Sequence, residues 1–162
     1  LGCVQERVDE KTSTWEQAII EDVKHTYPHA DVVEIEDYED FGDYYLVNVR
    51  VSFDVDTPCP TRMRIRYRYP AYGYEPSIPK YIVKDCQFVC DDNCMIAYEE
   101  QAIVAAHTLS GTEKVQGFID DDTKASASFD EEEKVWRVVF TKGNSSMTVL
   151  ISPNPPTVMS IE

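Results

Sequence analysis

The tetrapeptide Glu-Gln-Ala-Ile occurs twice in this chain, at residues 16–19 and again at residues 100–103. Each copy opens a stretch in which apolar side chains recur at the spacing of one helix face. Pro28 ends the first stretch and Gly111 ends the second, because proline breaks a helix and glycine is favoured just past a helix end. We therefore expect two similar halves, each of which begins with a helix.

After each predicted helix, apolar and polar residues alternate, which is typical of strands with one buried and one solvent-exposed face. The alternating segments are residues 47–55, 62–69 and 80–89 in the first half, and residues 124–129, 134–141, 147–152 and 157–161 in the second. The sequence therefore predicts an α+β fold of two tandem modules, each with one helix packed on an antiparallel sheet. We place these modules at residues 14–90 and 91–162, with residues 1–13 as a polar tether.

The second half runs from its Glu-Gln-Ala-Ile helix into the strands KVWRVVF, at residues 134–140, and MTVLI, at residues 147–151. In this pattern, residues 100–161 resemble a PepSY-type domain. PepSY domains are extracytoplasmic modules associated with peptidase propeptides, and their fold is similar to that of cystatins. The resemblance implies a cystatin-like fold for the second half, with the first half as a divergent copy.

Cystatins inhibit peptidases with a Gln-x-Val-x-Gly hairpin and a Pro-Trp hairpin. Here residues 87–91 (QFVCD) lack the glycine, and neither Trp follows a Pro. The resemblance therefore implies the fold rather than peptidase inhibition.

Thirty acidic and fifteen basic side chains give the chain a formal net charge of −15. Nucleic-acid binding requires a broad basic surface, so we do not expect a nucleic-acid partner. No apolar run in the sequence reaches the ~18 residues that a membrane-spanning helix requires. Acidic runs lie at residues 36–43, 91–93 and 120–122. We expect them in solvated loops, because none has the alternating Asp-x-Asp-x-Asp-Gly pattern of a calcium-binding loop.

The residues around Cys3 read Leu-Gly-Cys, which resembles the end of a lipobox, the signal whose cysteine becomes the acylated first residue of a prokaryotic lipoprotein. Setting Cys3 aside leaves an even number of cysteines, as an oxidising compartment favours. We therefore expect lipidation at Cys3, and an extracytoplasmic protein that meets the membrane only through this anchor. The alternative is an ordinary free cysteine near the N-terminus.

Cys59, Cys86, Cys90 and Cys94 form a separate group. Their spacing has neither the Cys-x-x-Cys pair of structural zinc sites nor a standard iron–sulfur pattern, so we predict two disulfides and no metal ion. Four cysteines allow three connectivities. We favour Cys59–Cys86 with Cys90–Cys94, since the first ties a hairpin turn to the following strand and the second closes a short loop between the modules.

Arginines occupy every second position of one predicted strand, at residues 62, 64, 66 and 68, so their side chains share one face. In a hairpin that is symmetric about Cys59, Arg62 lies opposite Asp56 and Arg64 lies opposite Asp54. Cross-strand ion pairs of this kind contribute about 0.2–1 kcal/mol each. One interpretation of these arginines is therefore structural.

The same register leaves three arginines without an acidic partner, namely Arg50, Arg66 and Arg68, beside a loop that contains Tyr72 and Tyr74. On an acidic chain, such a basic patch would steer an anionic ligand to one place, and tyrosines supply rigid contact area. The second interpretation is a binding surface formed by these five residues, with an unknown protein or an acidic ligand as the partner.

Candidate catalytic groups are few. Pro28 lies between His25 and His29 and breaks the helix that would present both to one metal ion. His107 lies in an apolar helical stretch, and no Ser or Cys is placed by the sequence as its nucleophile partner. We therefore predict a non-catalytic binding or inhibitory module, without catalytic residues, cofactor or metal ion. The alternative is an extracytoplasmic enzyme whose site is assembled from residues distant in the sequence, with converging titratable groups in one pocket.

Overall fold

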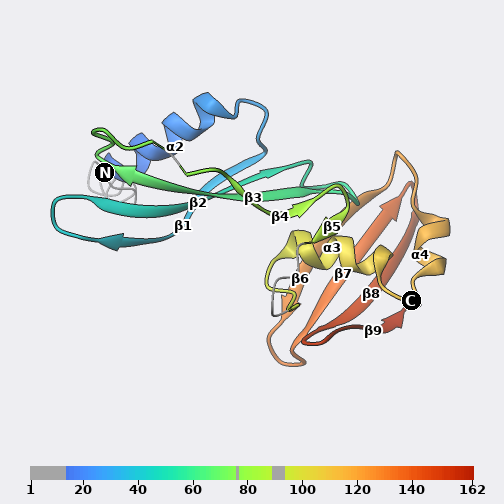
Figure 1. Cartoon of the computed structure of the whole chain (residues 1–162). Coiled ribbons are helices and arrows are strands. Elements are labelled where there is room, and N and C mark those ends of the chain that lie inside the picture. Colours follow the sequence, from blue (N-terminus) through green and yellow to red (C-terminus); the bar gives the residue numbers. More distant parts are fainter. Residues whose placement is uncertain (1–13, 76, 89–93) are drawn as a thin grey trace, which may run out of the picture. The chain divides into compact units, whose positions relative to one another are not determined.

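The computed structural model describes residues 14–75, 77–88 and 94–162, and Figure 1 shows the course of the chain. The helices are α2 (Thr14–Thr26), α3 (Glu99–Thr108) and α4 (Glu113–Phe118). The strands are β1 (Val32–Asp40), β2 (Tyr45–Phe53), β3 (Thr61–Tyr69), β4 (Lys80–Lys84), β5 (Gln87–Phe88), β6 (Lys124–Asp130), β7 (Val135–Lys142), β8 (Ser145–Pro153) and β9 (Pro156–Ile161). The predicted tether and the predicted boundary at residues 90 and 91 lie outside the described residues.

The strands form two antiparallel sheets in which each strand pairs with its neighbour in the chain. One sheet has the order β1-β2-β3-β4-β5 and the other has the order β6-β7-β8-β9. Sequential antiparallel strands need only short connections, as the turn-like segments of the sequence predict. The protein therefore belongs to the predicted α+β class.

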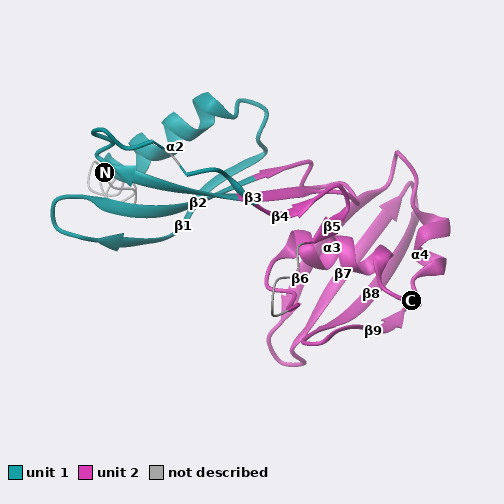
Figure 2. Cartoon of the chain, in the orientation of Figure 1, with its two compact units in different colours: residues 1–51, 64–80 teal, residues 52–63, 81–162 magenta. Residues whose placement is uncertain are grey.

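The chain divides into two compact units (Figure 2). Unit 1 consists of Leu1–Val51 and Arg64–Lys80, and unit 2 consists of Ser52–Met63 and Tyr81–Glu162. The tip of the hairpin between β2 and β3 thus belongs to unit 2.

Contacts within unit 2 hold this hairpin tip. The amide N–H of Ala125, in β6, donates to the carbonyl oxygen of Asp56 at 2.8 Å, and Lys124 Nζ lies 3.6 Å from the Asp56 carboxylate. A disulfide joins Cys59 of the same turn to Cys86. The hairpin tip therefore packs with the second half of the chain.

In unit 1, α2 lies along one face of the strands, as Figure 1 shows. Ile19 and Val23 of this helix are buried, as the helical spacing predicts. The buried apolar residues of the strands in this unit are Val47, Val49, Val51 and Ile65. Their alternation confirms the predicted period of two residues, and the helix ends at Thr26, shortly before the predicted stop at Pro28.

In unit 2, α3 packs on the sheet of β6 to β9. The core consists of alanines of the helix and larger apolar residues of the strands, including Ala102, Ala105, Ala106, Val138, Phe140, Val149 and Ile151. Each fully buried Val, Ile or Phe side chain contributes about 1.5–3 kcal/mol. All four predicted strands of this half are present, with ends within two residues of the predicted ones.

The helix α4 has no counterpart among the predicted helices. It has only six residues, fewer than the window of about 11 residues over which a helical period can be recognised. Val115 is its buried residue and joins the same core as α3. Phe118 of the same helix also packs against this core, so tertiary packing rather than a periodic pattern accounts for the helix.

The strand β1 also has no predicted counterpart, and the expectation that residues 36–43 form a solvated loop is wrong for residues 36–40, which belong to β1. Charged residues occupy positions of β1 at which the period-two strand pattern requires apolar residues. Glu34 accepts a hydrogen bond from Arg50 at 2.7 Å, and Glu36 accepts one from Arg64 at 3.1 Å. Ion pairs with arginines of β2 and β3 therefore take the place of apolar contacts in this strand.

The segment predicted as one strand over residues 80–89 contains two strands, β4 and β5. Val83 pairs with Phe88, and Lys84 pairs with Gln87. The turn between them consists of Asp85 and Cys86, which both have positive φ angles, 54° and 57°. Aspartate tolerates this conformation, which two-residue hairpin turns of type I′ require. Only four residues separate the apolar Val83 from the apolar Phe88, so no long polar stretch marks the break.

Candidate functional site

The arginines of β2 and β3 have different partners. Arg50 donates to Glu34 at 2.7 Å and is buried, so the prediction that it lacks an acidic partner is wrong. The reason is that Glu34 lies in the unpredicted strand β1. Arg64 pairs with Glu36 at 3.1 Å. Both arginines therefore serve the packing of the sheet in unit 1.

Arg62 belongs to a buried polar network in unit 2. Its guanidinium donates to Glu100 Oε1 at 2.9 Å, and the two side chains are 6% and 1% exposed. Ser52 Oγ donates to the other carboxylate oxygen at 2.6 Å, and the Arg62 guanidinium lies 3.7 Å from the centre of the Tyr98 ring. Asp56, the partner expected for Arg62, forms an ion pair with Lys124. The network links the hairpin tip to α3.

Arg66 and Arg68 form no ion pair with any residue that the structure describes. Arg66 is exposed. The Arg68 guanidinium lies 4.1 Å from the centre of the Tyr44 ring, and Tyr44 stacks on Phe41 with ring centres 5.0 Å apart. A cation held over an aromatic ring keeps its charge available at low cost in side-chain entropy. These two arginines remain candidates for binding.

The loop that follows β3 carries Tyr72 and Tyr74. Tyr72 is 89% exposed, and Tyr74 is half-buried, with its amide N–H donating to the carbonyl of Ala71 at 3.1 Å. Ser77 in the same loop fastens it to β3: the Arg66 amide donates to Ser77 Oγ at 3.2 Å, and the Ser77 hydroxyl donates to the Arg66 carbonyl at 3.3 Å. The structure thus attaches the tyrosine loop to the strand that carries Arg66 and Arg68. We call Arg66, Arg68, Tyr72 and Tyr74 the arginine–tyrosine surface.

A pocket of about 350 Å³ lies in unit 1 between α2, β3 and this loop. Its lining residues are Asp22, Val23, Thr26, Tyr27, Ile65, Tyr67, Ser77, Ile78 and Pro79. The Tyr67 hydroxyl donates a hydrogen bond to the Asp22 carboxylate. An apolar pocket with a few polar groups is typical of ligand-binding sites. The strand pattern places Tyr67 on the apolar face of β3, but it gives no sign that the helix leaves this space open.

Replacing Tyr67 with phenylalanine is expected to change how stability depends on alkaline pH. Burial first, and then the hydrogen bond to Asp22, raise the pKa of Tyr67 from 10.0 to about 12. A raised pKa means that the neutral hydroxyl is favoured in the folded state. Its stabilisation is fully present below the ordinary value and is lost as the pH rises from about 10 to about 12. Urea unfolding across this window should show a larger loss of unfolding free energy for the wild type than for Tyr67→Phe. Equal losses would contradict the assignment, and Tyr72→Phe is the matched control because Tyr72 is exposed.

The predicted disulfide between Cys59 and Cys86 is confirmed, with Cα atoms 4.9 Å apart. It joins the hairpin turn after β2 to the turn between β4 and β5. Cys94 is also disulfide-bonded, and its predicted partner, Cys90, lies outside the described residues, as does Cys3. Lipidation and the second pairing therefore stay predictions.

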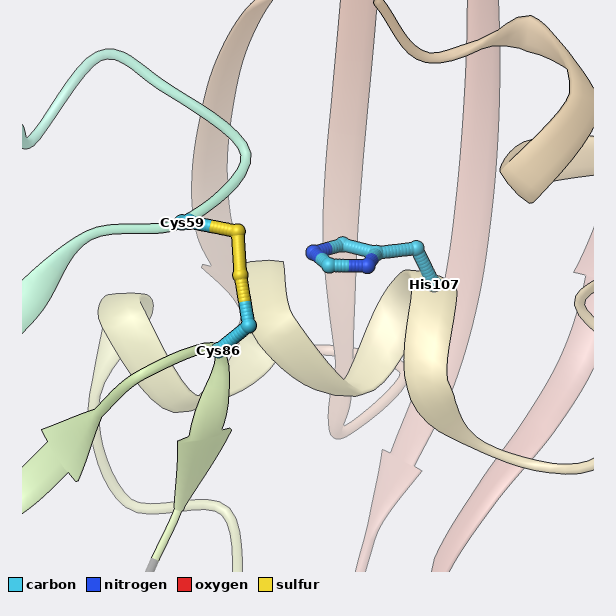
Figure 3. Close-up of side chains that lie close together, drawn as sticks. All are labelled: Cys59, Cys86 and His107. Carbon is cyan, nitrogen blue, oxygen red and sulfur yellow. A yellow bond between two sulfur atoms is a disulfide. The ribbon is translucent and has the colours of Figure 1, made fainter.

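His107 lies beside this disulfide, as Figure 3 shows. A ring nitrogen of His107 and the two sulfur atoms lie within 4.8 Å of one another, although as a disulfide the two cysteines offer no thiol nucleophile. The cysteines come from turns that are 48 and 21 residues away in the chain, and no local spacing could signal this. The three atoms could hold a metal ion only after reduction, because thiolates and not disulfide sulfurs are metal ligands.

No protein-family model, curated protein or solved structure shows significant similarity to this chain. The resemblances to PepSY-type domains and to a lipobox therefore stay predictions. Within the described part of the chain, none of the helices is long and apolar enough to cross a membrane.

Proposed function

We propose that the protein is a non-catalytic binding module that works outside the cytoplasmic membrane and binds an acidic ligand through the arginine–tyrosine surface of unit 1. The observation that carries this proposal is the difference among the arginines. Arg50, Arg62 and Arg64 have carboxylate partners, whereas Arg66 and Arg68 form no ion pair among the described residues. A carboxylate-rich segment of a partner protein would supply the missing partners.

The charge of the chain supports this choice of ligand. With a net charge of −15, most of the surface repels an anion, so an anionic ligand is steered to the few places where positive charge is not neutralised. Guanidinium groups bind carboxylates with two parallel hydrogen bonds, which gives geometric selectivity as well as energy. Tyr72, which is 89% exposed, offers rigid contact area beside them.

The cellular location is part of the same proposal. A disulfide that ties two turns together, as Cys59–Cys86 does, is typical of proteins that leave the reducing cytosol. A lipid anchor at Cys3 would hold the binding module at the membrane surface.

We further infer that the chain consists of two divergent cystatin-like modules, at residues 14–90 and 91–162. In support, α2 and α3 both contain the Glu-Gln-Ala-Ile tetrapeptide, and each is followed by antiparallel strands in sequential order. The resemblance of the second half to a PepSY-type domain points the same way.

One observation favours the alternative function, an extracytoplasmic enzyme. Asp22 and Tyr67 meet in the pocket of unit 1, and the pKa of Tyr67 is raised to about 12. A titratable group with a perturbed pKa in a pocket is one sign of a functional site. A tyrosine hydroxyl with a raised pKa is nevertheless a poor nucleophile near neutral pH, so binding is the better-supported role.

Replacing Arg66 and Arg68 with serine is expected to weaken the binding of an acidic peptide about tenfold or more, because two charge-assisted contacts are lost. The probe is a fluorescein-labelled peptide of ten glutamates, and its anisotropy is measured at low salt. The matched control is Lys114→Ser with Arg137→Ser, which removes the same charge from exposed positions of unit 2. Equal weakening in both double variants, or no change in either, would overturn the proposal.

A further inference from the structure

The two cysteines of the Cys59–Cys86 disulfide differ in their exposure to solvent. Cys59 is exposed, whereas Cys86 and His107 are half-buried. Pro58 and Pro60 on either side of Cys59 are buried, so the exposed residue Cys59 lies in a turn whose flanks are fixed. In Figure 3 the edge of the imidazole ring points toward the two sulfur atoms. Cys59 is therefore the more accessible of the two cysteines, and an imidazole lies beside both sulfur atoms.

The hydrogen bond of His107 holds the ring in this position. Its Nε2 lies 2.6 Å from the carbonyl oxygen of Pro58, the residue that precedes Cys59. A carbonyl can only accept, so Nε2 carries a proton at the disulfide. The edge contact with Phe140, with ring centres 6.1 Å apart, supports the ring from the core side. The proton-bearing nitrogen is thus built into the site rather than free to rotate away.

We propose that Cys59–Cys86 is a redox-active disulfide that exchanges with small dithiols, and that His107 acts as the proton donor to the departing cysteine. This activity is independent of the binding surface of unit 1. Thiol–disulfide exchange proceeds by attack of a thiolate on one sulfur, and its rate depends on access to that sulfur and on the stability of the departing thiolate. The exposed Cys59 meets the first requirement, and an adjacent imidazole meets the second.

A thiolate of the dithiol attacks Sγ of Cys59, and the bond between Cys59 and Cys86 breaks. The bonding electron pair leaves on Sγ of Cys86, which takes a proton from the imidazolium of His107. The second thiolate of the reagent then attacks the reagent sulfur bound to Cys59, which closes the cyclic disulfide of the reagent and releases Cys59. The dithiol is oxidised by two electrons and releases its two thiol protons to solvent. One proton from solvent restores the imidazolium that His107 spent on Cys86, and a second protonates Cys59.

Reduction kinetics of the oxidised full chain test this proposal. The protein is incubated with excess dithiothreitol near neutral pH and quenched with iodoacetamide, and the alkylated cysteine peptides are quantified by mass spectrometry. His107→Ala is expected to slow the reduction of Cys59–Cys86 by about tenfold or more, as expected on losing a positioned proton donor. Imidazole added to the buffer should restore part of the rate. The disulfide that contains Cys94 is the internal reference, and its rate should not change.

His107→Gln separates chemistry from structure. The glutamine amide can still donate a hydrogen bond to the Pro58 carbonyl, but it cannot transfer a proton. The proposal requires His107→Gln to be slow as well, with an unchanged near-UV circular dichroism spectrum. A wild-type rate in His107→Gln, faster reduction in His107→Ala, or an equal change at the Cys94 disulfide would each show that His107 only supports the fold, and would overturn the proposal.

Discussion

Replacing Glu100 with alanine is expected to lower the free energy of unfolding by about 3–5 kcal/mol, because it removes the carboxylate that pairs with a buried guanidinium. Glu100 is 1% exposed, and its two oxygens accept hydrogen bonds from Arg62 Nη1 at 2.9 Å and from Ser52 Oγ at 2.6 Å. Without the carboxylate, the guanidinium of Arg62 stays in an environment where its own side chain is only 6% exposed. Urea unfolding followed by circular dichroism measures the loss, and the midpoint should fall while the slope is unchanged.

Two further variants show whether the loss comes from breaking the buried ion pair. The double variant Arg62→Met with Glu100→Leu removes both charges, and it should be more stable than Glu100→Ala, because apolar residues of similar volume often replace a buried ion pair without loss. Glu132→Ala, which truncates an exposed glutamate in the turn before β7, should change stability by less than about 0.5 kcal/mol. A Glu100→Ala variant as stable as Glu132→Ala would contradict the role assigned to the network.

The strands of the second half could be predicted from the sequence because their apolar period is regular. In β7, Trp136, Val138 and Phe140 are buried while Arg137 is exposed, and a period of two residues is sufficient to find such a strand. In β1, Glu34 and Glu36 pair with Arg50 and Arg64, and neither supplies an apolar side chain to the pattern. A hydrophobicity pattern does not identify a strand whose side chains form ion pairs with neighbouring strands instead of apolar contacts.

In the candidate sites too, some contacts could be predicted from the sequence and others could not. The Cys59–Cys86 disulfide could be predicted because a turn and a strand that follow one another bring the two cysteines close. The contacts of Glu100 with Arg62 and Ser52 join residues 38 and 48 positions apart, and the approach of His107 to Pro58 joins residues 49 positions apart. These contacts depend on how α3 packs against the hairpin tip, which no local pattern specifies. Arg66 and Arg68 were found because their predicted cross-strand neighbours are not acidic.

The alanines of α3 and the ring of Phe140 form a complementary pair in the core of unit 2. Ala102, Ala105 and Ala106 are fully buried, and their small side chains allow the helix to approach the sheet closely. Phe140 is also fully buried, in the central strand β7. Its neighbours across the sheet are Ala125 and Met147. One large ring therefore fills a space that small side chains on two sides leave open.

Replacing Phe140 with alanine is accordingly expected to lower the free energy of unfolding by about 3–5 kcal/mol, the sum of lost transfer energy and an unfilled cavity. The alanines around the ring cannot extend into the space, and neighbouring side chains of a close-packed core move only partly. Phe140→Leu keeps most of the volume and should lose clearly less in the same urea titration. Met159→Ala is the surface control, because Met159 is 61% exposed. If Phe140→Ala were no less stable than Met159→Ala, the ring would not be the central packing element of unit 2, and the alanines of α3 would require another explanation.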